Sequence, residues 1–295
     1  MKKNILVLGG TKFFGKKTVN LLLEKGYQVT IATRGNTPHA FGDKVDHIIL
    51  DARDGFHEGW REVTSHSWHA VFDNVCYTKE DARLIIEKLQ GNMEQLFFTS
   101  SMAVYQGDKD GYEESDFDPF TYTIDPEKQV TYGEGKRQAE TVFYTEAPFP
   151  VTSFRLPIVL DTDDYTERLL YYVEKGVNEE TIRFQYSDVL VNYVKGSEAA
   201  EAIVWLIEHE KEGIFNISSR DAIPVQTFIQ WLEEGVGKPI QVVYSGQPEP
   251  DSPFSVKHDQ YLVSDKLIRE GFELSTLEEW LKPLIRELRA QVENK

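Results

Sequence analysis

Short apolar runs alternate with amphipathic helical patterns along the first half of the chain. Near-continuous apolar runs predict strands at residues 4–8, 28–33, 45–50, 69–75, 95–101 and 151–156. Helical patterns lie between several of them, including one at 130–146. This alternation predicts an α/β fold with a doubly wound parallel sheet covered on both faces. The ligand crevice of such a sheet lies at the carboxyl ends of its strands.

The second half is less regular. Helical patterns occur at 165–176, 196–210 and 276–292, with Pro283 as a point for a kink. Residues 188–194 and 213–218 have the pattern of strands that could extend the same sheet. These segments indicate a smaller C-terminal region beside the regular first half.

Charge and cysteine content exclude several classes of protein. The chain has 295 residues and a net charge of −17, which argues against a general nucleic-acid binder because phosphate contacts need clustered Lys and Arg. The single cysteine, Cys76, allows no intrachain disulfide and no cysteine-based metal site, and we expect no metal. No apolar run is long enough for a membrane span, so we expect no membrane partner and a reducing cytoplasmic compartment.

The glycine loop after the first strand has two interpretations. Gly10 to Lys16 fits G-x-x-x-x-G-K, but Lys17 replaces the Ser or Thr that a phosphate-loop enzyme needs for its metal. Gly9, Gly10 and Gly15 instead provide a tight turn, close approach to a pyrophosphate and a helix N-terminus behind it. We therefore favour a dinucleotide site, although the full G-x-G-x-x-G pattern is absent.

The end of the second strand indicates which dinucleotide is bound. NAD sites usually have a carboxylate there, whereas this chain has Thr33 followed by Arg34. A guanidinium can bind a 2′-phosphate bidentately, and Lys12 could add a second positive charge. The sequence thus predicts NADP, with NAD as the alternative cofactor.

Six motifs occur in an order that is typical of one family. They are "GGTKFFG", "TRG", "DARD", "FFTSSMAVYQG", "YGEGK" and "RLPIVL". With them the chain resembles the extended short-chain dehydrogenase/reductase family, also called NAD-dependent epimerase/dehydratase proteins. The resemblance covers nearly the whole chain and implies a Rossmann fold.

A tyrosine and a lysine one helical turn apart form the candidate catalytic pair. Tyr132 and Lys136 share a helix face, and a nearby ammonium favours a phenolate that can exchange a proton with a substrate. The pair matches the family's Tyr-x-x-x-Lys motif, and Ser101 matches its hydroxyl residue.

The residue-level argument, which gives Lys12 and Arg34, and the resemblance together predict a set of cofactor-binding residues. They are Gly9, Gly10, Thr11, Lys12, Phe13, Phe14, Gly15, Arg34, Asp51, Ala52, Asn74, Tyr132, Lys136 and Pro157. Two departures matter: Lys12 stands where the family has a middle glycine, and Met102-Ala103 stand where its dehydratases have Asp-Glu. The second departure weakens a dehydratase interpretation.

The predicted function is hydride transfer by an NAD(P)-dependent oxidoreductase or epimerase. Its partner would be a small hydroxyl or carbonyl substrate, a sugar nucleotide being one class, and family analogy suggests a homodimer. The alternative is a non-catalytic NADP-sensing or RNA-associated protein on the same fold. We expect a dinucleotide-binding domain at 1–157, to which 188–217 returns, and a substrate-binding region formed by 158–187 and 218–295.

Overall fold

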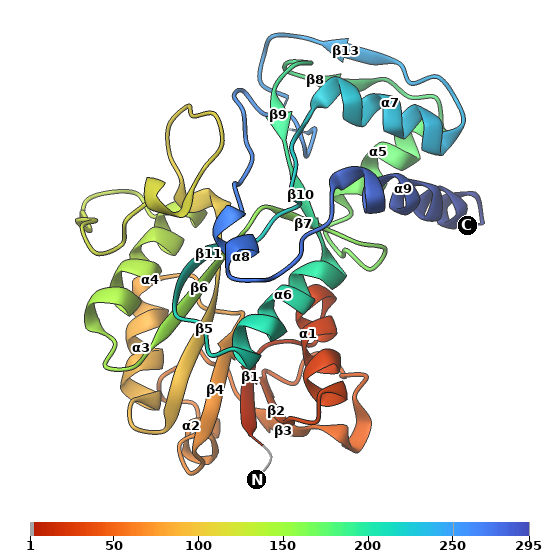
Figure 1. The fold of residues 1–295 in the computed structure, drawn as a ribbon. Helices are drawn as coiled ribbons and strands as arrows, with labels where there is room; N and C mark the ends of the chain where they lie inside the picture. Colours follow the sequence, from red (N-terminus) through yellow and green to blue (C-terminus); the bar gives the residue numbers. More distant parts are fainter. Residues whose placement is uncertain (1–2, 250, 295) are drawn as a thin grey trace. The chain divides into compact units, whose positions relative to one another are not determined.

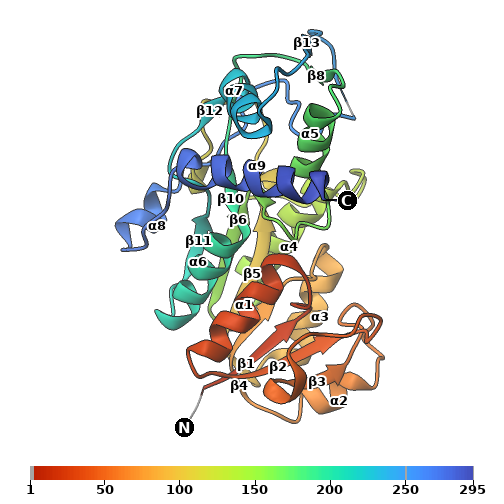
Figure 2. The ribbon, with the colours of Figure 1, turned by 90° about the vertical axis from the view of Figure 1, so that its right-hand side faces the viewer.

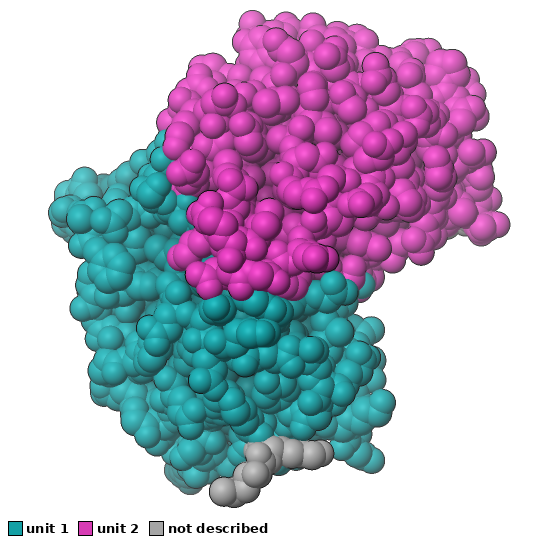
Figure 3. Space-filling view, in the orientation of Figure 1, with its two compact units in different colours: residues 1–106, 114–156, 199–216 teal, residues 107–113, 157–198, 217–295 magenta. Residues whose placement is uncertain are grey.

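The computed structural model describes residues 3–249 and 251–294 (Figure 1). Its contacts divide the chain into two compact units (Figure 3). Unit 1 comprises the described residues up to Gln106, Glu114–Leu156 and Ala199–Asn216. Unit 2 comprises Gly107–Glu113, Pro157–Glu198 and the described residues from Ile217 onward. Residues 188–198 therefore group with unit 2 and not with the sheet domain.

The centre of unit 1 is a seven-stranded sheet in the order β11-β6-β5-β4-β1-β2-β3. All its pairings are parallel. The strands are β1 (Asn4–Leu8), β2 (Gln28–Thr33), β3 (Asp46–Ile49), β4 (Trp68–Asp73), β5 (Met93–Ser101), β6 (Val151–Leu156) and β11 (Gly213–Asn216). The order runs outward from β1 in both directions, which confirms the predicted doubly wound Rossmann fold.

Helices cover both faces of this sheet (Figures 1 and 2). Helices α3 (Lys79–Leu89) and α4 (Tyr132–Glu146) lie on one face, and α1 (Phe13–Glu24) and α6 (Gly196–Glu208) lie on the other. Because both faces are covered, the central strand β1 is apolar throughout its last four residues, all of which are fully buried. A short helix, α2 (Gly59–Val63), follows β3.

Of the two later strands expected to extend the sheet, one does so. The edge strand β11 pairs with β6 within the predicted 213–218 segment. The segment 188–194 is extended as predicted, since it contains β9 (Leu190–Val191) and most of β10 (Tyr193–Lys195). Its predicted place in the main sheet was wrong, because both strands pair outside that sheet. Asn192, between them, is buried, and its amide donates to the Leu262 carbonyl at 2.9 Å. A buried polar side chain that bonds within unit 2 interrupts what looked like one continuous strand.

The core of unit 2 is formed by three helices, α5 (Arg168–Val177), α7 (Val225–Val236) and α9 (Leu277–Glu293). Helix α9 begins with a capping box, close to the predicted start, and contains Pro283. The smaller elements are β7 (Ile158–Leu160), β8 (Ile182–Phe184), β12 (Ile223–Pro224), β13 (Val242–Tyr244) and α8 (Asp265–Arg269). No helix in the described ranges is long and apolar enough to cross a membrane.

Candidate functional site

The glycine loop after β1 is shaped by positions that exclude side chains. Gly9 and Gly10 have φ values of 91° and 76°, which favour glycine. A Cβ on Gly10 would lie 2.5 Å from Val7 Cγ1, and one on Gly15 would lie 3.1 Å from Asn74 Nδ2. No side chain caps the N-terminus of α1 at Lys12. A narrow loop before an uncapped helix N-terminus fits the pyrophosphate of a dinucleotide.

Lys12 replaces a glycine without backbone strain. Its φ and ψ are −132° and 153°, an extended conformation that any residue adopts. The left-handed conformation falls instead on Phe13, with φ of 52°. Lys12 is exposed, whereas Phe13 is buried and Thr11 and Phe14 are half-buried. The departure from the family's glycine pattern therefore leaves the loop intact.

At the ends of β2 and β3, the predicted specificity residues lie on the surface. Thr33 Oγ1 accepts a hydrogen bond from Gly35 N at 3.2 Å and lies 2.9 Å from His47 Nε2. Arg34 is exposed. Asp51 Oδ1 accepts from the Arg53 backbone N–H at 3.1 Å, and Ala52 beside it is buried. The Thr33 hydroxyl is thus engaged with the protein, whereas the neighbouring Arg34 side chain is exposed.

At the end of β4, two neighbouring residues differ in environment. Asn74 is half-buried, and its N–H donates to the Leu8 carbonyl at 3.2 Å, which ties this turn to the glycine loop. Cys76 is buried, and burial raises the pKa of its thiol well above the usual value. A neutral, inaccessible thiol is not a nucleophile.

The predicted catalytic pair lies at the start of α4. Tyr132 is its first residue and is 55% exposed, whereas Lys136 is 2% exposed. Lys136 Nζ donates to the Cys76 carbonyl at 2.6 Å and to the Thr99 carbonyl at 2.7 Å. It lies 6.0 Å from the centre of the Tyr132 ring. The ammonium is therefore fixed by two carbonyls, beside a phenol that solvent reaches.

Ser101 lies at the end of β5, in a turn that packs on the start of α4. Its Oγ accepts from the Ala103 N–H at 3.2 Å. A Cβ on Gly133 would lie 2.3 Å from the Ala103 carbonyl oxygen, so only glycine allows this close approach. Arg137 Nη1 donates to the Val104 carbonyl at 3.0 Å. Close packing and this hydrogen bond join the serine turn to the helix that carries Tyr132.

Glu134, a buried carboxylate two residues after Tyr132, was not among the residues predicted from the sequence. It accepts from the Tyr122 hydroxyl at 2.7 Å and the Arg137 guanidinium at 2.9 Å, and it pairs with Lys128 at 2.9 Å. Burial alone would raise its pKa, but hydrogen bonds from Lys128, Tyr122, Gln138 and Arg137 lower the pKa of Glu134 to about 2. It ties the start of α4 to the preceding loop.

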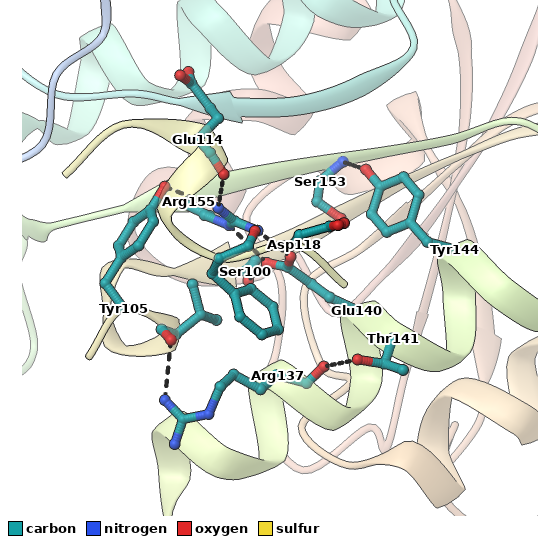
Figure 4. A network of polar contacts seen from close by, with 12 residues as sticks. Ser100, Tyr105, Glu114, Asp118, Arg137, Glu140, Thr141, Tyr144, Ser153 and Arg155 are labelled. Atoms are coloured by element: carbon teal, nitrogen blue, oxygen red, sulfur yellow. Dashed lines mark hydrogen bonds and ion pairs between the residues drawn. The ribbon is translucent and has the colours of Figure 1, made fainter. Parts of the chain in front are cut away.

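A buried polar network includes Ser100, the residue before Ser101 (Figure 4). Its arginine, Arg155, belongs to the predicted motif "RLPIVL", whereas its carboxylate, Glu140, was not among the predicted residues. Arg155 on β6 and Glu140 on α4 are fully buried and pair at 2.6 Å. Glu140 also accepts from the Ser100 hydroxyl, and Arg155 donates to the Glu114 carbonyl at 2.8 Å. This buried network fixes β5, β6 and α4 around the residue that precedes Ser101.

The structure thus brings most of the predicted residues to one edge of one sheet. The glycine loop, Asn74, Ser101, Tyr132 and Lys136 follow or flank the carboxyl ends of β1, β4 and β5. Pro157 begins the second segment of unit 2, directly after β6, and its contact with the cofactor stays a prediction.

Comparison with known families identifies the chain. The model of the NAD-dependent epimerase/dehydratase family matches residues 5–218, most of the chain. The chain belongs to this family. The predictions of the family and of an enzyme are therefore confirmed.

Solved structures of similar fold include sugar-nucleotide enzymes. UDP-glucose 4-epimerase from Thermus thermophilus, solved with NAD, is 19% identical with a TM-score of 0.73, covering 98% of this chain and 99% of that one. The Thermotoga maritima enzyme, solved with UDP-glucose, is 21% identical with a TM-score of 0.75 and the same coverage of 98% and 99%. dTDP-glucose 4,6-dehydratase from Bacillus anthracis, solved with NAD, is 15% identical with a TM-score of 0.74, again over 98% and 99%. At these identities the likeness shows the fold.

A curated plant relative matches part of the chain. It is the chloroplast stem-loop binding protein of 41 kDa b from Arabidopsis thaliana, 30% identical over 117 residues. The match covers 35% of this chain and 30% of that protein.

Proposed function

We propose that this protein is an NADP-preferring oxidoreductase or epimerase that acts on a hydroxyl or carbonyl group of a small molecule. The main support for this proposal is the position of Lys136, whose buried ammonium is fixed by two carbonyls beside the exposed phenol of Tyr132. A sugar nucleotide is the substrate class we favour, because epimerases of the same fold act on such compounds.

In this proposal Tyr132 is the proton-transfer group. The positive charge of Lys136 favours the phenolate, which can take a proton from a substrate hydroxyl or return it to a carbonyl. Ser101, at the end of β5, would orient the same substrate oxygen. The nicotinamide, when bound, supplies or accepts the hydride. Two of the three Lys136 N–H groups are engaged by carbonyls, and the third is directed to the cofactor ribose in this scheme.

The preference for NADP rests on the end of β2. Thr33 stands where an NAD site has a carboxylate, and its hydroxyl is already engaged with Gly35 and His47. No charge there repels a 2′-phosphate, and the exposed Arg34 can bind it bidentately. Lys12 is exposed on the neighbouring glycine loop and would add a weaker attraction.

The test combines cofactor titration with a single-atom change. NADPH and NADH are titrated by fluorescence, and turnover is measured with UDP-glucose and UDP-N-acetylglucosamine. We expect tighter binding of NADPH, and Tyr132→Phe should lower turnover by about 100-fold or more while NADPH binding stays within about twofold. Tyr27→Phe, at the turn before β2, is the matched control and should retain full turnover. Failure to bind either cofactor would refute the proposal.

The alternative is a non-catalytic protein on the same fold. The plant relative, whose name describes stem-loop binding, is the observation that favours it. The net charge of −17 opposes binding to a polyanion. Salt-dependent binding of a stem-loop RNA, without turnover of any sugar nucleotide, would favour this alternative.

A further inference from the structure

Asp73, the last residue of β4, is a fully buried carboxylate with one unused oxygen. Its Oδ1 accepts from the backbone N–H groups of Val75 and Cys76 at 2.8 and 3.0 Å. Its Oδ2 is buried and has no hydrogen-bond partner among the described residues. A buried carboxylate oxygen without a hydrogen-bond partner destabilises the folded state, so we expect a positive charge nearby that compensates for it.

The Lys136 ammonium lies on the same face of the sheet. Asp73 and Phe98 are register partners in neighbouring parallel strands, so their side chains point the same way. Lys136 Nζ lies 4.8 Å from the centre of the Phe98 ring. The turn that Asp73 holds also presents the Cys76 carbonyl to Lys136. Asp73 therefore lies on the same face of the sheet as Lys136, and it also holds the turn whose Cys76 carbonyl binds the ammonium.

The other charged groups around Lys136 already have partners. Asp81 on α3 accepts from the Tyr77 and Thr78 N–H groups and from Arg53, and Glu140 on α4 is paired with Arg155. The Tyr77 ring lies on one side of the ammonium, with its centre 4.6 Å away. Of the nearby carboxylates, Asp73 is the one whose charge no arginine balances.

Burial disfavours the charged form of both groups, and the opposite charge of each group partly offsets this cost in the other. It raises the pKa of Asp73 to about 6, against the hydrogen bonds from Val75 and Cys76 and the charge of Lys136. It also lowers the pKa of Lys136, and this is opposed by Cys76 and then by the carboxylates of Asp73, Glu140 and Asp81, so Asp73 is the first of the carboxylates. Each of the two charges thus makes the other less costly.

We infer that Asp73 is a positioning residue: a buried counter-ion that keeps Lys136 protonated and, through the Cys76 carbonyl, holds its ammonium beside Tyr132. Asp73 would contact neither substrate nor cofactor in this role. The benefit of this arrangement for catalysis rests on the proposed function. The effect of Asp73 on the charge of Lys136 does not, because that charge can be measured without substrate or cofactor.

The test is an NMR titration of the full chain containing lysine labelled at Cε with an NMR-active isotope. Lys136→Met identifies the signal. Asp73→Asn keeps the oxygen that accepts from Val75 and Cys76 but removes the charge, and we expect the Lys136 midpoint to fall by about one pH unit or more. Asp54→Asn is the matched control, since Asp54 Oδ1 makes the same kind of turn with the Phe56 N–H at 3.0 Å but is exposed.

The wild-type protein gives a second readout that does not depend on a variant's folding. Its Lys136 signal should show a second inflection near pH 6, where Asp73 takes up a proton. The inference would be overturned if the titration midpoint of Lys136 were the same in the wild type and in Asp73→Asn. If Asp73→Asn does not fold, the absence of the second inflection in the wild type would overturn it. Loss of turnover alone would bear on the proposed function and not on this one.

Discussion

The two ends of the predicted cofactor site hold their cations in opposite ways. At one end, Lys136 is 2% exposed and fixed by two carbonyls, with the ion pairs of Glu134 and Glu140 on the same helix. At the other, Arg34 is exposed, and its guanidinium makes no hydrogen bond within the part of the chain that the structure describes. The Lys136 end is thus held rigidly by the fold, whereas the Arg34 end is free to adapt.

This contrast implies that charge changes at the two ends differ in their effect on stability. A buried ion pair that loses one partner leaves an uncompensated charge in a dry environment. An exposed cation loses little when it is removed. The Lys136 end should therefore tolerate few substitutions, and the Arg34 end many.

The largest effect is expected for Arg155→Met. This change strands the buried carboxylate of Glu140 and removes the donor to the Glu114 carbonyl, so the free energy of unfolding should fall by about 3–5 kcal/mol. Urea unfolding at neutral pH measures it. Arg34→Met is the matched control at the other end, with an expected change within about 0.5 kcal/mol.

A double variant distinguishes two causes of the lost stability: the unpaired charge of Glu140 and the lost packing of the Arg155 side chain. Adding Glu140→Gln to Arg155→Met should restore part of the stability, because the neutral amide no longer requires a cation. Equal losses for Arg155→Met and Arg34→Met would abolish the contrast between the two ends.

An intermediate effect is expected for Glu134→Gln. The pKa of Glu134 is lowered from 4.5 to about 2, so its ionised form stabilises the folded state above the unfolded pKa, and that contribution is lost as pH falls through the folded pKa. The variant should lose about 2–3 kcal/mol at about pH 7, and the difference should narrow by about 1 kcal/mol at about pH 3.5. Chemical unfolding at both pH values measures this.

Glu146→Gln, on the same helix, is the control for the Glu134 experiment. Glu146 pairs with Arg83 at 2.8 Å, but both side chains are largely exposed, so a loss under about 1 kcal/mol is expected. A Glu134→Gln loss that does not change with pH would contradict the role given to its charge.

The residues that sequence could predict are those with a local signal. The glycine loop and the strand ends depend on spacing within one or two elements, so the sequence pattern placed them. The pair Tyr132–Lys136 also needed the family resemblance, because an isolated Tyr-x-x-x-Lys occurs by chance. Asp73 and Glu140 belong to no sequence motif that would indicate their burial. Their burial depends on partners far along the chain, such as Ser100 for Glu140. One signal was present: positions 132, 136 and 140 share a helix face, which placed Glu140 beside the catalytic pair.

The strand conformation predicted at 188–194 is confirmed, but its place in the main sheet was wrong for a related reason. A run of β-type residues predicts an extended chain but not the sheet that the chain joins. Asn192 decides the outcome through hydrogen bonds to Ser218 and Leu262, which are distant in sequence. Polar residues that are buried by tertiary contacts therefore account for the misplaced strand as well as for the missed network.

The smallest effect, and the sharpest test of the adaptable end, is expected for Arg34→Ala. Losing a charge-assisted contact with the 2′-phosphate should weaken NADPH binding by about tenfold, while NADH binding changes by less than about twofold, because NADH has no phosphate at this position. Fluorescence titration of both cofactors gives the ratio. Lys12→Ala should have the same sign but only about a threefold effect, and Arg61→Ala, an exposed arginine in α2, should alter neither affinity. If Arg34→Ala weakened the binding of both cofactors equally, the guanidinium would contact a part of the dinucleotide that NADPH and NADH share. The end of β2 would then not determine the preference for NADP.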